Sequence, residues 1–419
     1  MQIQRRFSFD SVAINQQTPP VKNLQQLSAK WILFFSTNAS LAATPLPCEV
    51  SITNSTKNTR APRILVHQLA VPFLASQMSK NFSVSSEGQL RYRFSNNNVI
   101  WARDRFPLRI IKADGKIKLL AYASLLNLPN QLFFDGGSTY IPVHPPKDSG
   151  PNALPYSLPS GGYEWLEVEA LPLFLEGGNI QINDGVIFVG EKVFQQNSKS
   201  LEEWMALIQK HLGGSSSKLR RDLIEKGYRP RSETEVRLEF SAKTGVSPDK
   251  IIKMPWLPGE KTGHVDVYLG RLNEKTLVIP QIQDSEINAL SMNHEREFAQ
   301  KTKDWLDKQS AEVSRTVLKL GIRVIRIPML PPRNLVPSSI SPLGWDAQFP
   351  STVNFIVDGS RILVPDFPNF ADSLQKNLSH QLREQIKITL EAEGFEVVFI
   401  NSEELLSHNG LLHCISGEI

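Results

Sequence analysis

Hydrophobic residues along the chain mark out one order of elements that returns several times: two short apolar strands joined by a polar turn, a helix, and a third strand. In the clearest copy the turn is Asp184-Gly185 and the hairpin ends near Val193. Apolar residues three and four apart then predict a helix over Leu201–Leu212, and a second helical stretch covers residues 236–242. The largely apolar run Ile251–Met254 predicts the closing strand.

The other copies keep this order with different spacings. Glycines just past two of their helices, Gly321 and Gly394, are typical of a helix C-cap. An early copy has predicted strands over 63–66 and 99–101 and a later turn at 113–116. Another has a turn at 273–275, a helix over 286–320 and a strand over 324–327. The last has a turn at 358–359, a helix over 373–393 and a strand over 396–400. The pattern predicts an α/β protein built from repeated units.

Chemically reactive side chains occupy the same place in these units, next to the start of the hairpin. They are Asp104, Glu176, His264 together with Asp266, and Cys414 near the C-terminus. If each unit contributes one spoke to a ring, these residues converge on its centre although they lie far apart in the sequence. Glycines beside Glu176 and before His264 would let the backbone come close to a ligand.

These residue types fit one kind of substrate. A cysteine is reactive as the thiolate and His264 can exchange protons near neutral pH, but three carboxylates would oppose ionisation of the thiol. A planar guanidinium resolves the conflict, because it pairs bidentately with carboxylates and its charge favours the thiolate. The predicted reaction is attack of Cys414 on the guanidinium carbon. In it His264 serves as acid and base, Asp104 and Asp266 hold the substrate, and Glu176 orients His264 or binds one nitrogen.

Composition narrows the function classes. The chain has 419 residues, 41% hydrophobic, with a net charge of +4, and no long basic and aromatic segment indicates nucleic-acid binding. No apolar run reaches the ~18 residues that would span a membrane. With two cysteines, Cys48 and Cys414, a free thiol in the cytoplasm is expected, although residues 31–43 also fit a short signal segment. Residues 1–58 are expected to form an irregular extension before a main domain over 59–419.

Four short motifs in order resemble those of the agmatine deiminase and peptidyl-arginine deiminase family of guanidino-group-modifying enzymes. They are Trp101-Ala102-Arg103-Asp104, Glu176-Gly177-Gly178-Asn179, Gly263-His264-Val265-Asp266 and His413-Cys414-Ile415-Ser416, and the resemblance spans about residues 60–419. It implies the pentein fold, a five-bladed α/β-propeller of ββαβ units. It also implies Cys414 and His264 as the catalytic pair, Asp104, Glu176 and Asp266 as substrate-binding residues, and no cofactor.

The resemblance leaves the substrate open among agmatine, free arginine and peptidyl-arginine, and hence the context open between putrescine biosynthesis and citrullination. Arg105-Phe106-Pro107 and Gln181 depart from the agmatine deiminase pattern, while the stretch from 350 to Cys414 is closer to the peptidyl-arginine deiminases. A calcium-binding accessory domain is not evident in the sequence. The oligomeric state is not indicated.

Other functions stay open on the residues alone. An amidinotransferase would use the same side chains but pass the amidino group to an amine. A metal-binding or hydrolytic site could use His264, Asp266, His413 and Cys414. A binding module without activity is a further alternative. A papain-like hydrolase needs its cysteine before its histidine, which is the reverse of the order here. Taken singly, His413, Trp101 and residues 134–137 are expected to be structural.

Overall fold

The protein is described here from a computed structural model. The structure describes the backbone of residues 48–52, 64–66, 82–85, 108–111, 117–123, 153–157, 163–183, 185–212, 229–338, 341–369, 376–407 and 410–418. Side chains are described for most of the residues from 163 onward and for a few before them.

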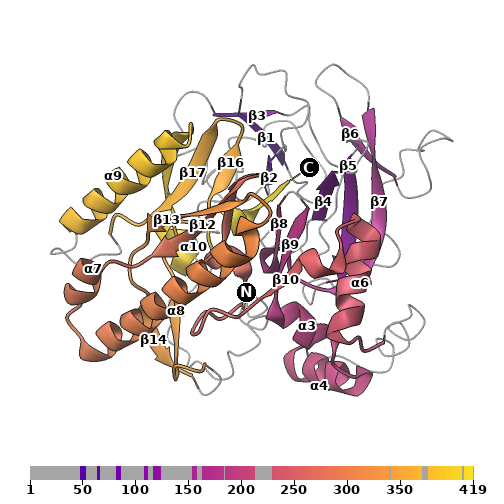
Figure 1. Ribbon diagram of the computed structural model, residues 1–419, viewed down its shortest axis with the longest axis horizontal. Helices are drawn as coiled ribbons and strands as arrows, with labels where there is room; N and C mark the ends of the chain where they lie inside the picture. Colours follow the sequence, from indigo (N-terminus) through magenta and orange to yellow (C-terminus); the bar gives the residue numbers. More distant parts are fainter. Residues whose placement is uncertain are drawn as a thin grey trace, which may run out of the picture.

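Three sheets repeat one topology: an antiparallel hairpin whose second strand pairs in parallel with a strand that follows a helical connection (Figure 1). The first contains β8 (Ile180–Asn183), β9 (Val186–Gly190) and β10 (Ile251–Met254); the second contains β11 (Gly270–Asn273), β12 (Thr276–Gln281) and β13 (Arg323–Pro328); the third contains β16 (Ile356–Asp358), β17 (Arg361–Asp366) and β18 (Glu396–Asn401). The predicted α/β class, with sheets that mix parallel and antiparallel pairs, is confirmed.

Two further sheets vary this topology. One pairs β4 (Leu108–Ile111) with β5 (Ile117–Ala123) as a hairpin, adds β7 (Tyr163–Phe174) in parallel, and gains an extra antiparallel strand, β6 (Ala153–Ser157). The other pairs the strand that follows Cys414, β19 (Ser416–Glu418), with β2 (Ile64–Val66), and β2 continues to β1 (Cys48–Ile52) and β3 (Phe82–Ser85). The two ends of the described chain therefore lie in one sheet.

β1 falls within residues 1–58, which the sequence analysis places outside the main domain. It is hydrogen-bonded to β2 on the other side of that boundary. A separate two-stranded ribbon, β14 (Arg333–Pro337) with β15 (Trp345–Gln348), lies beside the pocket described below.

Helices connect the hairpins to their parallel strands. α3 (Glu191–Asn197), α4 (Leu201–Leu212) and α6 (Glu233–Thr244) lie between β9 and β10; α7 (Asp284–Asn288) and α8 (Asn293–Leu318) lie between β12 and β13; α9 (Lys376–Ala392) lies between β17 and β18; and α10 (Glu403–Ser407) follows β18. Gly321 and Gly394, both with positive φ, follow α8 and α9 as predicted. The helix predicted over 286–320 is two helices, because the chain turns to bury Leu290 in the core and Arg296 donates to the Leu290 carbonyl.

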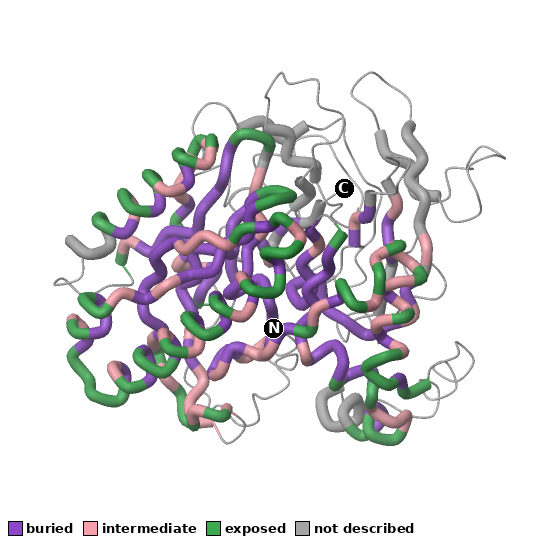
Figure 2. The backbone as a smooth tube through the Cα atoms, in the orientation of Figure 1, coloured by how far each residue is buried: buried purple, intermediate pink, exposed green. Residues whose placement is uncertain are grey.

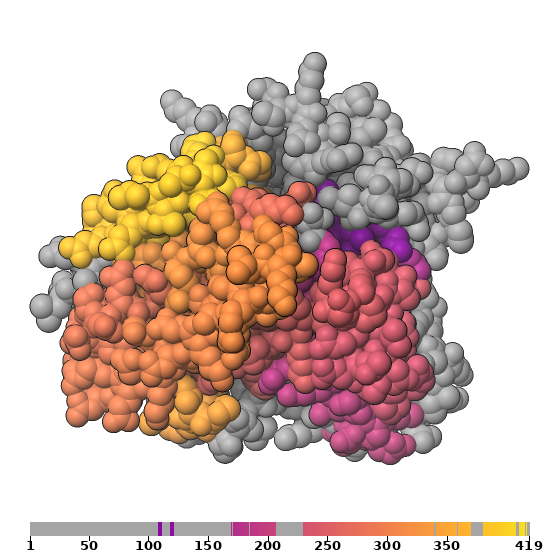
Figure 3. Space-filling model, viewed as in Figure 1, coloured from indigo at the N-terminus to yellow at the C-terminus, as the bar shows by residue number. Residues whose placement is uncertain are grey.

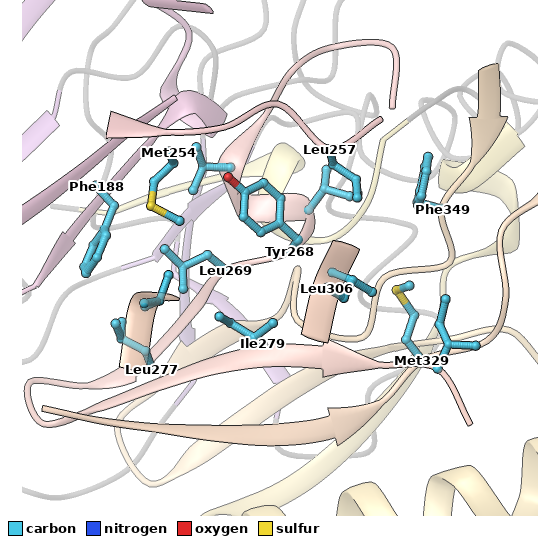
Figure 4. Close-up of a cluster of buried hydrophobic side chains, with 14 of the residues drawn as sticks. Phe188, Met254, Leu257, Tyr268, Leu269, Leu277, Ile279, Leu306, Met329 and Phe349 are labelled. Carbon is cyan, nitrogen blue, oxygen red and sulfur yellow. The ribbon is translucent and has the colours of Figure 1, made fainter. Parts of the chain in front are cut away.

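The largest core cluster lies between the β11–β13 sheet, α8 and the segment that carries His264 (Figure 4). Tyr268 is buried in it, donating its hydroxyl to the Pro255 carbonyl and packing edge-on against Trp305. Buried backbone is concentrated in the strands, whereas exposed residues lie on the outer faces of α8 and α9 (Figure 2). On the face shown in the space-filling view, the unit that contains β8–β10 lies next to the units that follow it in the chain (Figure 3). No helix among the described residues is both long and apolar enough to cross a membrane.

The carboxyl group of Glu286 provides a test of the buried α7 segment. Glu286 is 1% exposed and accepts one hydrogen bond from the Gln283 amide, and burial raises its pKa to about 8. Because the folded-state pKa lies above the unfolded one, stability is lost as pH rises from the unfolded value through about 8. Glu286→Gln should stabilise the protein by a few kcal/mol at about pH 9 and much less at about pH 4, since each pKa unit is worth about 1.4 kcal/mol.

Urea unfolding at the two pH values measures this difference. Glu274→Gln, at an exposed turn, is the matched control and should leave the pH dependence unchanged. Equal stabilisation by Glu286→Gln at both pH values would contradict a buried, neutral carboxyl group.

Candidate active site

Each candidate residue that the structure describes lies in, or directly before, a tight turn that leads into a strand. Glu176 precedes a turn of 3₁₀ helix over Gly177–Asn179, and His264 precedes another over Val265–Val267. Cys414 lies within a third such turn, His413–Ile415, that leads into β19. Asn354 holds the corresponding position before β16. At each of these turns the backbone changes direction and continues as a strand, whereas the candidate side chain lies at the start of that strand.

Glu176 and His264 form a buried pair. His264 Nε2 lies 3.0 Å from Glu176 Oε2, and both residues are less than 10% exposed. Lys192, at the start of α3, places Nζ 3.5 Å from the same carboxylate oxygen and donates to the Thr262 carbonyl. Burial acts to raise the pKa of Glu176, but Lys192 and His264 together outweigh it and lower that pKa to about 2. Glu176 is therefore a carboxylate at neutral pH and fixes the orientation of the imidazole.

The His264 ring lies so close to the backbone at position 178 that only glycine fits there. A Cβ atom at Gly178 would stand 2.4 Å from His264 Nδ1, which no side chain tolerates. The sequence predicts that this glycine lets the backbone come close to a ligand, and in the structure the group that it accommodates is the imidazole. Any larger residue here would push His264 away from Glu176.

The loop before His264 is held by one carboxylate. Glu260 accepts hydrogen bonds from the Thr262 amide and hydroxyl through Oε1. Its Oε2 accepts from the amides of Gly263 and His264. Gly263 adopts a positive φ of 69°, a conformation that favours glycine, so the chain can turn sharply into His264. Glu260 thus stabilises the conformation of the loop over residues 260–264.

Asp266 is paired with His413. The carboxylate is fully buried, and its Oδ2 lies 2.7 Å from His413 Nδ1, with His413 itself 8% exposed. From the sequence, Asp266 is expected to contact substrate and His413 to be structural. In the structure His413 is the residue that holds the Asp266 carboxylate in place, immediately beside Cys414 in the chain.

Asn354 links three segments at the same point. Its Oδ1 accepts a hydrogen bond of 2.9 Å from the His413 amide and lies 3.8 Å from Cys414 Sγ, within range of a thiol donor. Its Nδ2 donates to the Asp266 carbonyl. Asn354 is completely buried. The side chain therefore fixes the turn that carries Cys414 relative to the loop that carries His264 and Asp266.

A pocket opens over these groups. Its lining includes His264, Cys414 and Asn354. The other described lining residues are Glu260, Lys261, Thr262, Val267, Ala347, Gln348, Phe349, Leu406, Gly410 and Leu411. Cys414 is a free, half-buried thiol, so it is accessible from this pocket.

The structure thus brings Glu176, His264, Asp266 and Cys414 to one region, as the repeat predicts. Asp104 and residues 134–137 lie outside the described residues, as does Trp101. Asn354, Lys192 and Glu260 were missed. Asn354 could have been found from its position at the start of the fourth unit, whereas the roles of Lys192 and Glu260 depend on tertiary contacts. Among the described residues, no three His, Cys, Asp or Glu side chains form a group that could hold a metal ion.

Comparison with solved structures finds similar folds over most of the chain. One is a protein assigned provisionally as a peptidyl-arginine deiminase, with 16% identity and a TM-score of 0.45, covering 76% of this chain and 75% of that one. Another is the agmatine deiminase of C. jejuni, with 14% identity, a TM-score of 0.42, and coverage of 83% and 78%. A third is the agmatine deiminase of Enterococcus faecalis, with 14% identity, a TM-score of 0.36, and coverage of 76% and 74%.

The chain is similar to these deiminases. No protein-family model and no curated protein sequence matches it. At such identities and TM-scores the likeness carries no weight for the chemistry of this chain, which depends on its own residues.

The contact between Asn354 and the thiol can be tested through cysteine reactivity. Asn354→Asp keeps the size of the side chain and places a negative charge beside Cys414, among His264, His413 and Asp266. A nearby carboxylate disfavours the thiolate, so the midpoint of alkylation by iodoacetamide should move about one pH unit upward. Asn273→Asp, the same change at an exposed turn, should leave the midpoint where it is. An unchanged midpoint in Asn354→Asp would show that Asn354 does not contact the thiol.

The role of Lys192 can be tested through the pH dependence of catalysis. Lys192→Met removes the cation that lowers the pKa of Glu176, while burial continues to raise that pKa. Because Glu176 must be ionised to orient His264, the acidic limb of the kcat/KM profile should shift to higher pH, by about one unit or more. Lys250→Met, at an exposed position, is the control. An acidic limb at the wild-type position in a folded Lys192→Met variant would contradict this role.

Proposed function

We propose that this protein is a deiminase, a C–N hydrolase that converts a guanidino group to a ureido group and ammonia. The observation that supports it most is the placement of a free thiol and a carboxylate-oriented imidazole, Cys414 and His264, in the lining of one pocket. Beside them lie the ionised Glu176 and the buried side chain of Asp266, and carboxyl groups of this kind suit a planar cation.

The reaction proceeds through a covalent intermediate. The Cys414 thiolate adds to the guanidinium carbon, and ammonia leaves with a proton from His264, giving an amidino-thioether. His264 then accepts a proton from water, which adds to the same carbon. The C–S bond breaks, the ureido product forms and the thiol is restored. The substrate's own positive charge favours the thiolate, so ionisation and substrate binding are coupled.

Carboxylates position the substrate. Asp266, held by His413, and Asp104 are assigned to the guanidinium nitrogens, and Glu176 acts through His264. Fixing a cation between oriented carboxylates aligns its carbon with the nucleophile, and positioning of this kind lowers the barrier by several kcal/mol. The substrate is agmatine, free arginine or peptidyl-arginine. No cofactor takes part in the steps assigned to these residues.

The fold proposed for this function is a five-bladed propeller whose units surround the pocket. Support comes from the five sheets that begin next to a candidate residue: β4 follows Asp104, β8 follows Glu176, β11 follows His264, β16 follows Asn354, and β19 follows Cys414. Pairing of β19 with β2 joins the last unit to the beginning of the main domain, which is assigned to residues 59–419 after an extension over 1–58.

Loss of the two catalytic groups should abolish the activity. Cys414→Ser and His264→Ala are each expected to lower the rate of ureido formation by at least about a thousandfold, because the first removes the nucleophile and the second the proton carrier. Cys48→Ser is the matched cysteine control and should stay active. Colorimetric detection of the ureido product, without added amine, measures the effect and separates hydrolysis from amidino transfer. Turnover by Cys414→Ser would refute the mechanism.

A further inference from the structure

We propose that the pocket selects guanidino compounds whose far end carries a carboxylate, and that Lys261 is the residue that selects it. This inference rests on the proposed deiminase function and concerns the half of the substrate that does not react. It separates substrates whose far end carries a carboxylate, such as free arginine, from those that end in an amine alone, such as agmatine.

The charged residues in the described pocket lining favour binding of an anionic group. Apart from the reactive His264 and Cys414, the charged residues among them are Glu260 and Lys261. Lys261 is half-buried and makes no ion pair with any other described residue. Its field reaches Asp346, whose pKa burial raises and Lys261 lowers, but Asp346 is not one of the lining residues and is hydrogen-bonded to Ser338.

The carboxylate of Glu260 is already hydrogen-bonded within the protein. Both of its carboxylate oxygens accept hydrogen bonds from the loop over 262–264, which makes four donors in all. A substrate ammonium would have to compete with these backbone amides, and breaking them would release the loop that positions His264. Lys261, in contrast, lines the pocket and makes no ion pair with another described residue. An anionic tail therefore gains an ion pair, whereas a cationic tail meets a like charge.

The walls of the pocket fit the part of the molecule between the two charged ends. Its described lining includes the apolar side chains of Val267, Ala347, Phe349, Leu406 and Leu411. Methylene groups of a short aliphatic linker would be removed from water against these side chains, and each buried methylene contributes about 0.8 kcal/mol. Phe349 also belongs to the largest core cluster, so its side chain is packed among other core residues (Figure 4).

The experiment compares three compounds with the same four-methylene linker: guanidinopentanoate, which ends in a carboxylate; pentylguanidine, which ends in a methyl group; and agmatine, which ends in an ammonium. The wild type should show kcat/KM in that order, with the carboxylate about tenfold above the ammonium, a difference equivalent to about 1.4 kcal/mol. Lys261→Glu should invert the ratio between carboxylate and ammonium, and added salt should shrink it in both proteins. Lys250→Glu, an identical charge change at an exposed site outside the described lining, should leave the ratio unchanged.

The outcomes separate the two proposals. If none of the three compounds is deiminated, and neither is a peptide that contains arginine, the proposed function is wrong. If pentylguanidine is turned over but the carboxylate has no advantage, or if Lys261→Glu leaves the ratio as it was, the function stands and the assignment of Lys261 is refuted. Inversion by Lys261→Glu together with an unchanged ratio in Lys250→Glu supports the assignment.

Discussion

Burying a carboxylate without a compensating charge is costly, and the centre of this protein is arranged around that constraint. Glu176 is buried and yet ionised because Lys192 and His264 both contact one of its oxygens, and together they outweigh burial, which acts to raise its pKa. The imidazole is fixed only while that charge persists. Gly178 supplies the space for the ring, and Glu260 holds the loop that delivers it. Removal of any of these supports would disturb the position of the His264 side chain.

A second histidine–carboxylate pair lies at the C-terminal side of the site. His413 holds Asp266, and Asn354 ties the His413 amide and the Cys414 thiol to the Asp266 backbone. Cys414 is thus positioned by residues from two other units, although it lies within a short turn. This explains how a cysteine close to the end of the described chain can be placed accurately. β19 pairs with β2 directly after it and anchors the turn on its other side.

The sequence predicted those helices and strands whose hydrophobic residues follow a regular period, because that period depends on local structure. α4 and β10 begin and end at the predicted residues, and the helices before Gly321 and Gly394 end as expected. The meeting of Glu176 with His264 followed from the repeat, because equivalent positions converge. Lys192 and the Asp266–His413 pairing could not be predicted, since they depend on how one unit packs against the next and no spacing encodes that contact. The break between α7 and α8 was missed for a similar reason, because burial of Leu290 overrides a continuous helical pattern.

The central claim is that Cys414 forms a bond to the guanidino carbon. Mass spectrometry of protein quenched in acid during turnover tests it most directly, with digestion to locate any modification. The account predicts, on the peptide that contains Cys414, an adduct with the mass of the substrate less ammonia. This adduct is absent from the peptide that contains Cys48 and absent throughout the Cys414→Ser variant. Steady formation of ureido product with Cys414 unmodified at every quench time, and equal product from Cys414→Ser, would contradict it.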